Sequence, residues 1–213
     1  MENSTKHLED LSEIRNIMER STKFLSLSGW SGIFAGIIAL IGALAAYWFL
    51  GGSSINFDET LTVFASKNQI SPRIFLLVDA LIVLFLALVA AFVFSYRKAT
   101  KRGEKIWTPV TRRLLFQLAV PLLSGGALSL ILIWDNHLNL LAPLTLIFYG
   151  LALVNAGKYT THEIVVLGIA EIAMGLAAAL WQDLGLYFWA AGFGLFHIIY
   201  GIILYMKYDR KAA

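Results

Sequence analysis

The sequence of 213 residues contains no cysteine and little charge. Without cysteine there is no disulfide framework, no thiolate metal site and no cysteine nucleophile. Charged residues make up 15% of the chain, whereas soluble globular domains average about 25%. Apolar residues make up 58%, and the charged residues are concentrated between long apolar stretches. This distribution indicates a membrane protein rather than a soluble domain with a large core.

The sequence also lacks the signatures of metal, haem and nucleotide sites. Only His197 of the four histidines lies deep in an apolar run. A three-ligand zinc site needs several ligands that converge on one point, and a bis-histidine haem needs a second histidine at the same depth. The pair His162-Glu163 lacks the second histidine of a metalloprotease helix. We therefore predict no metal, no cofactor and no assigned catalytic residue.

Six apolar runs are long enough to cross a bilayer, whose hydrocarbon core of about 30 Å needs roughly 20 helical residues. They span residues 26–50, 73–96, 113–134, 138–156, 161–181 and 186–206. The predicted fold is an all-α, polytopic bundle of six transmembrane helices built of antiparallel hairpins, in a domain covering 25–213. Residues 1–24 predict an amphipathic helix, which either lies on the membrane surface or binds a protein partner.

The basic residues predict the orientation of the six helices. With both termini in the cytoplasm, 15 of the 17 lysines and arginines fall inside, and only Lys67 and Arg73 fall outside. The opposite orientation would invert this ratio and break the positive-inside rule. The basic cluster at 97–113 is expected to face anionic lipid headgroups rather than nucleic acid.

The fifth and sixth runs share a pattern around their one strongly polar residue. Glu171 and His197 each stand among glycines with the same spacing, in the strings GIAEIAMG and GLFHIIYG. Both lie about 13 residues from the turn that joins the two runs, so they have nearly equal depth near the middle of the bilayer. Small residues let membrane helices approach closely. We therefore expect the two stripes to pack together and to bring Glu171 and His197 face to face. The glycines of the two stripes are Gly168, Gly175, Gly194 and Gly201.

An ionisable group at this depth costs several kcal/mol unless it is paired, and it marks a functional site by default. Glu171 and His197 are thus candidates for relaying protons or binding a cationic solute. The alternative is a structural hydrogen bond that holds the hairpin together. Asp79, Gln117 and Asn155 are weaker candidates, for accessory polar positions or for caps and interhelical contacts.

Two stretches resemble a group of small, uncharacterised bacterial membrane proteins. They are MERSTKFLSLSGWSGIFAGIIALIGA, from Met18 to Ala43, and LYFWAAGFGLFHIIYGIILYMKYDR, from Leu186 to Arg210. The glycine spacing also resembles the six-helix acid-resistance membrane proteins of the HdeD type, although the long segment 51–72 departs from their compact repeat. These resemblances imply a six-helix protein of a bacterial inner membrane.

Three classes of function follow from these observations. The first is a small-solute or proton-linked transporter or conductor with a central Glu171–His197 site. The second is a non-transporting regulatory, stress-response or scaffold protein that acts through its N-terminal helix and basic loop. The third is a lipid-modifying intramembrane enzyme. The glycine stripes would equally serve packing between two copies of the chain.

Overall fold

The computed structural model describes residues 27–50 and 71–210, and the predicted N-terminal helix at 1–24 lies outside these residues. The described part is helical and contains six helices long and apolar enough to cross a membrane, which confirms the predicted all-α fold class. These spans are α2 (Gly29–Phe49), α4 (Pro72–Lys101), α5 (Pro109–Trp134), α6 with its flanking turns (Leu138–Tyr159), α7 (His162–Leu180) and the C-terminal span (Gln182–Asp209). The C-terminal span consists of η3 (Gln182–Leu184), α8 (Gly185–Trp189), η4 (Ala190–Phe196), α9 (His197–Leu204) and η5 (Tyr205–Asp209).

Two of the helices begin with the same local signal. The side chain of Ser71 accepts a hydrogen bond from the backbone of Ile74, and Pro72 occupies the first turn of α4. Thr108 and Pro109 do the same for α5. A hydroxyl cap satisfies an otherwise unpaired amide, and proline has no amide to satisfy at this position. Both helices extend beyond the apolar runs from which they were predicted: α4 continues through residues 97–101, and α5 begins at residue 109.

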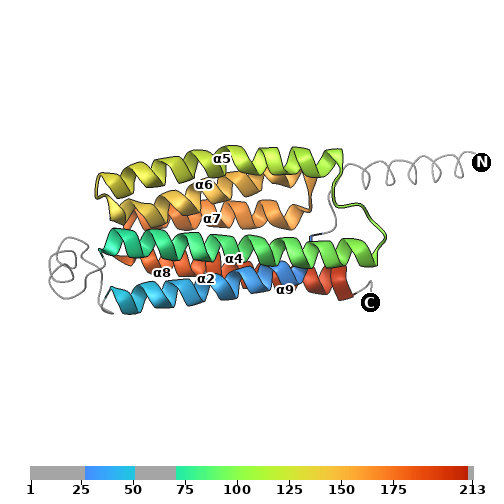
Figure 1. Cartoon of the computed structure of the whole chain (residues 1–213), viewed down its shortest axis with the longest axis horizontal. Coiled ribbons are helices and arrows are strands. Elements are labelled where there is room, and N and C mark those ends of the chain that lie inside the picture. Colours follow the sequence, from blue (N-terminus) through green and yellow to red (C-terminus); the bar gives the residue numbers. More distant parts are fainter. Residues whose placement is uncertain (1–26, 51–70, 211–213) are drawn as a thin grey trace, which may run out of the picture.

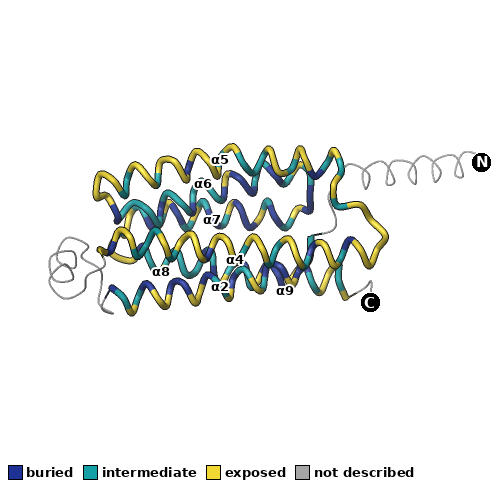
Figure 2. The backbone as a smooth tube through the Cα atoms, viewed as in Figure 1, coloured by how far each residue is buried: buried dark blue, intermediate teal, exposed yellow. Residues whose placement is uncertain are grey.

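The helices lie side by side along the long axis of the molecule, but not in the order of the sequence (Figure 1). α2 packs between α4 and the C-terminal span, and α7 packs against both α6 and the C-terminal span. α5 packs on the outside of α6. Only four of the 30 residues of α4 and two of the 26 residues of α5 are buried. In Figure 2 both helices are mostly yellow and teal, the colours of exposed and partly buried residues. The protein core therefore lies between α2, α6, α7 and the C-terminal span.

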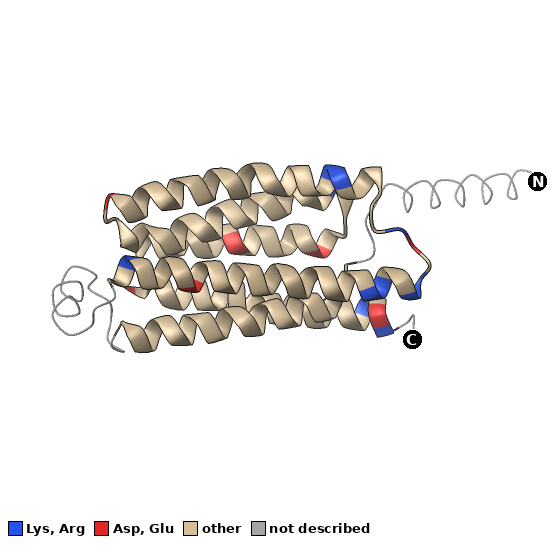
Figure 3. Cartoon of the chain, in the orientation of Figure 1, with Lys and Arg blue, Asp and Glu red and all other residues tan. Residues whose placement is uncertain are grey.

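Charged residues gather at the ends of the bundle, and the lengths of the helices carry few of them (Figure 3). We call the end that carries the α4–α5 connection and the C-terminus the basic end. The other end, here the opposite end, holds the turns at 135–137 and 182–184. An apolar helical surface with charged ends fits a lipid bilayer, so the chain is an integral membrane protein.

Asp209 joins three helices at the basic end. Its carboxylate accepts a hydrogen bond from the backbone amide of Gly29, at 2.8 Å, and one from the hydroxyl of Ser28, at 3.2 Å. The Nζ atom of Lys98 on α4 lies 2.7 Å from the other carboxylate oxygen. Asp209 thus supplies an acceptor to the first amide of α2, which its own N-cap residue Ser28 does not bond.

The glycine stripes do not pack against each other as we expected from the sequence. A methyl group built at Gly168 or Gly175 would meet residues of α6, such as Gly150 and Ile147. At Gly194 and Gly201 it would meet residues of α2 instead. The nearest residues to these two glycines are Leu40, Ile33 and Gly29. The expectation was wrong because small residues allow close approach to any complementary helix, and α2 and α6 supply the complementary surfaces.

Candidate functional site

Glu171 and His197 lie next to each other in the core. Glu171 is the tenth of the 19 residues of α7, and its side chain is completely buried. His197 is the first residue of α9 and is 6% exposed. The Nδ1 atom of His197 lies 3.4 Å from Oε1 of Glu171. The matching depth of the two residues thus placed them together, although the glycines beside them face other helices.

The imidazole ring of His197 forms both of its hydrogen bonds with other groups. Nδ1 lies 3.1 Å from the carbonyl oxygen of Gly192, and Nε2 lies 2.7 Å from the hydroxyl of Tyr149. Because a carbonyl can only accept, Nδ1 carries the proton in the first bond. In the neutral ring Nε2 then accepts a hydrogen bond from the Tyr149 hydroxyl. His197 is therefore held in one orientation without any bond from Glu171.

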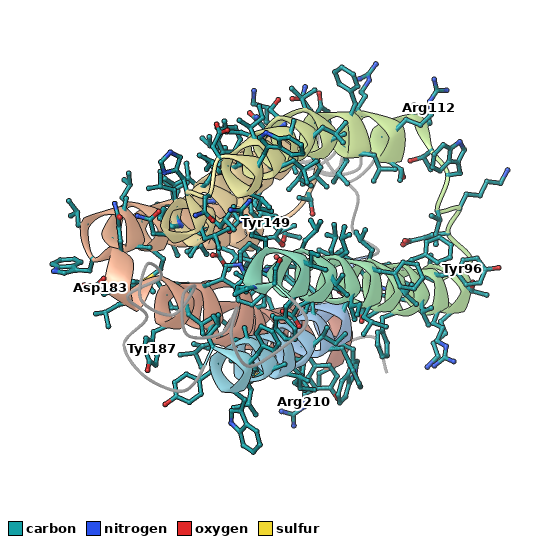
Figure 4. The ribbon with its side chains drawn as sticks, turned by 60° about the vertical axis from the view of Figure 1, so that its left-hand side comes forward. Tyr96, Arg112, Tyr149, Asp183, Tyr187 and Arg210 are labelled. Atoms are coloured by element: carbon teal, nitrogen blue, oxygen red, sulfur yellow. The ribbon has the colours of Figure 1, made fainter. Side chains whose placement is uncertain are left out.

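Tyr149 belongs to the site although the sequence analysis did not select it. It comes from α6 and is labelled among the side chains between the helices in Figure 4, whereas Tyr96 and Asp183 lie near opposite ends of the bundle. The Tyr149 and His197 rings have centroids 5.3 Å apart. The available signal was a tyrosine in the middle of an apolar run, far from the interfaces where membrane tyrosines are enriched.

A π-helical segment shapes the wall of the site opposite Glu171. Residues Ala190–Phe196 form the π-helix η4 immediately before His197. A methyl group built at Gly192 would come within 3 Å of the Glu171 carboxylate and of the Leu146 side chain. Only glycine therefore fits at this position without displacing the carboxylate. π-helical turns inside membrane or soluble helices often occur at functional sites, and this one supplies the carbonyl that orients His197.

The carboxylate of Glu171 has no hydrogen-bond partner at either oxygen within the described residues. The 3.4 Å separation from His197 exceeds the usual range of about 2.7–3.2 Å for an N–H···O bond. Leaving a buried polar group unpartnered costs about 1–3 kcal/mol. Among the described residues, the Glu171 carboxylate at the centre of a membrane span therefore has only the longer contact with His197.

The other polar candidates lie elsewhere. Asp79 faces α2, where a methyl group at Gly42 would meet its carboxylate at 3.3 Å. Gln117 is a partly buried residue of α5, and Asn155 is a partly buried residue near the end of α6. None of the three shares a contact with Glu171 or His197 that defines the site. In the described ranges, moreover, no three residues among the histidines and acids group closely enough to hold a metal ion.

Comparison with known proteins gives no relative from which a role could be transferred: no protein-family model, no curated protein and no solved structure matches this chain. The resemblances to uncharacterised bacterial membrane proteins and to the HdeD type stay predictions.

Proposed function

We propose that the protein is a small proton-linked transporter or conductor, in which Glu171 takes up and releases a proton inside the membrane. The observation that carries this proposal is the buried, unpartnered carboxylate beside an oriented imidazole. A carboxylate that gains a proton loses its charge, which is the change that low-dielectric surroundings favour most strongly. The same group can thus alternate between a charged and a neutral form as protons cross the membrane.

The geometry favours this reading over a structural hydrogen bond. A pair that holds two helices together needs a short bond between its members and satisfied remaining atoms. Here the ring of His197 is bonded to Tyr149 and Gly192, and the carboxylate of Glu171 has no hydrogen-bond partner among the described residues. Intramembrane acids paired with histidine are typical of proton relays.

The direct test is proton movement in liposomes. The purified protein would be reconstituted with an internal pH-sensitive dye, and valinomycin with a potassium gradient would impose a membrane potential. We expect proton uptake above that of empty liposomes, and we expect Glu171→Gln and His197→Ala to abolish it. Asp79→Asn is the matched control, because it makes the same chemical change at an acid outside the site.

Proton uptake that persists in Glu171→Gln would contradict the proposal. Uptake no greater than that of empty liposomes, from protein that elutes as a folded species, would also contradict a proton conductor. That second result would direct attention to the regulatory or scaffold function, in which the N-terminal helix and the basic loop bind a partner.

The remaining elements of the proposal concern location. We place the protein in a bacterial inner membrane with both termini in the cytoplasm, because this orientation puts nearly all basic residues inside. The basic end would then meet anionic headgroups through residues 97–113. Reporter fusions at each terminus test this orientation, and a periplasmic signal from either terminus would overturn it.

A further inference from the structure

The proton on Nδ1 of His197 lies beside two acceptors. The carbonyl oxygen of Gly192 is 3.1 Å from Nδ1, and Oε1 of Glu171 is 3.4 Å from the same atom. A hydrogen bond weakens steeply as it bends or lengthens, so one N–H group cannot bond both acceptors well. The distances show that Gly192 holds this donor in the present arrangement.

The two acceptors respond differently to the charge on Glu171. Hydrogen bonds to an ionised carboxylate are about twice as strong as those to a neutral acceptor, with N···O distances of about 2.7–2.9 Å. The separation of 3.4 Å between Nδ1 and Oε1 is therefore the geometry expected for a protonated, neutral carboxyl group. When that proton leaves, a displacement of about half an ångström is enough to form the charge-assisted bond.

The other side of the imidazole ring is anchored. Nε2 accepts a hydrogen bond from the hydroxyl of Tyr149, 2.7 Å away. The rings of Tyr149 and Phe193 pack against the imidazole, with centroids 5.3 Å and 6.0 Å from its own. A small turn of the ring about this anchored side can move Nδ1–H from Gly192 toward Glu171. Neither ring nitrogen gains or loses a proton in this movement.

Few ionisable groups face the ring from the described helices packed around it. α7 supplies Glu171, and α6 supplies Tyr149, which is the only ionisable residue of that helix. α2 contains no acidic residue, lysine, arginine or histidine. Tyr200 follows one turn later on α9, and its hydroxyl has no hydrogen-bond partner in the described residues. Within this part of the chain, Glu171 is thus the acid that contacts the ring.

We propose that His197 is a positioning residue, which donates Nδ1–H to Glu171 when the carboxylate is ionised and does not itself carry the proton. This inference rests on the proposed function of Glu171. The proton leaves and returns at the carboxyl group. The Nδ1–H bond passes from Gly192 to Glu171 and back, and the ring stays neutral. A donor therefore reaches the carboxylate when its charge appears.

Gly192 and Tyr149 then have defined roles beside His197. The carbonyl of Gly192 accepts from Nδ1–H while Glu171 is neutral, so the buried donor keeps an acceptor in both states. The hydroxyl of Tyr149 satisfies Nε2, so the ring needs no second proton. Buried polar groups of the ring thus stay bonded throughout the cycle, as they normally are in folded proteins.

The decisive variant is His197→Asn, measured by proton uptake in the same liposomes. The amide nitrogen of asparagine is bonded to Cγ, as Nδ1 is, so it can donate from the same place. It cannot accept a proton on one ring nitrogen and release another. A relaying histidine would lose about 10²–10⁴ in rate on this substitution, whereas a fixed donor predicts a loss of less than about tenfold.

Two other substitutions frame this result. His197→Ala has no donor and should show no uptake above empty liposomes. His162→Asn is the matched control, because it makes the same chemical change at an exposed histidine in the first turn of α7. It should leave the rate unchanged.

Two further measurements separate a fixed donor from a relay. Tyr149→Phe removes the hydrogen-bond partner of Nε2. A relay through the ring uses both nitrogens and would lose about 10²–10⁴ in rate, whereas a fixed donor should lose less than about tenfold. Nitrogen NMR of protein with isotope-labelled histidine reports the ring directly. We expect a neutral His197 ring with its proton on Nδ1 at every pH that supports uptake, in a signal missing from His197→Asn.

The outcomes separate this inference from the proposed function. A doubly protonated His197 ring, or loss of uptake in folded His197→Asn or Tyr149→Phe, would overturn the fixed donor and leave Glu171 as the proton carrier. Wild-type uptake in His197→Ala would also overturn it, because the donor would then be dispensable. No uptake by the wild-type protein would overturn both proposals. If neither His197→Asn nor Tyr149→Phe folds, the NMR signal of the wild-type ring decides the question.

Discussion

Replacing Glu171 by methionine should make the protein more stable. Methionine is apolar, flexible and similar in volume to glutamate, so it can fill the space beside Gly192 and Leu146 without a new strain. The substitution removes two carboxylate oxygens that are buried and have no hydrogen-bond partner in the described residues. Residues kept at a cost in stability are typical of functional sites.

The sign of the change in unfolding free energy distinguishes the two interpretations of the Glu171–His197 pair. If the carboxylate is an unpartnered functional group, its removal should stabilise the protein by about 1–3 kcal/mol. If it forms a structural ion pair with His197, the loss of one partner should destabilise by about 3–5 kcal/mol. The two interpretations predict changes of opposite sign in the unfolding free energy, so a measurement of moderate precision distinguishes them.

The matched substitution His197→Leu should have the opposite effect. It removes the two hydrogen bonds of the ring and leaves the hydroxyl of Tyr149 buried without its partner. We expect a loss of about 1–3 kcal/mol. Stabilisation by both substitutions would mean that the network of Tyr149 contributes nothing to the fold.

Thermal unfolding in one detergent, at one protein concentration, provides the measurement. A change of 1 kcal/mol corresponds to about 2–4 °C in Tm for a chain of this length. A rise in Tm for Glu171→Met and a fall for His197→Leu would support the site as described. A fall of about 6 °C or more for Glu171→Met would contradict an unpartnered functional carboxylate, because it would correspond to the loss of about 3 kcal/mol that a structural pair predicts.

Two further predictions concern the packing of the helices and use the same unfolding assay. Gly201→Ala should destabilise the protein by about 1–3 kcal/mol, because its methyl group would come within 3 Å of the backbone of Gly29. Gly126→Ala is the control: its methyl group meets open space, so it should stabilise by up to about 1 kcal/mol. Equal effects of the two substitutions would contradict the packing of Gly201 against α2. Asp209→Ala should cost about 1.5–3 kcal/mol through the lost bonds to Gly29 and Lys98. Asp209→Asn retains an acceptor for Gly29 and should cost less, and an equal loss would show that only the ion pair matters.

The six spans and the charged ends could be predicted from the sequence. A bilayer requires about 20 apolar residues for each helix. Because this requirement concerns consecutive residues only, each span can be predicted without knowing which helices contact each other. The apolar runs that predict a span end near the first charged residues, however, whereas the helices α4 and α5 continue through these residues. Lysine and arginine are good helix formers, which explains why α4 exceeds its apolar run. α5 begins before its apolar run because Thr108 caps it and Pro109 fits its first turn.

The position of Glu171 beside His197 could also be predicted from the sequence. A tight turn fixes two successive helices as antiparallel neighbours, so residues at equal distance from the turn have equal depth. Periodicity shows which residues share a face, but it does not show which helix covers that face. The glycine stripes therefore pack against α6 and α2 instead of against each other.

The membrane class, the number of spans and the depth of the two ionisable residues thus follow from the order of the amino acids alone. Three features depend on the tertiary fold: Tyr149 bonds His197, Gly192 makes room for the carboxylate, and the oxygens of Glu171 have no hydrogen-bond partner among the described residues. The physical reason is that depth follows from helix length along one axis. Hydrogen bonding depends on how the helices rotate and pack around that axis, which involves residues far apart in the chain.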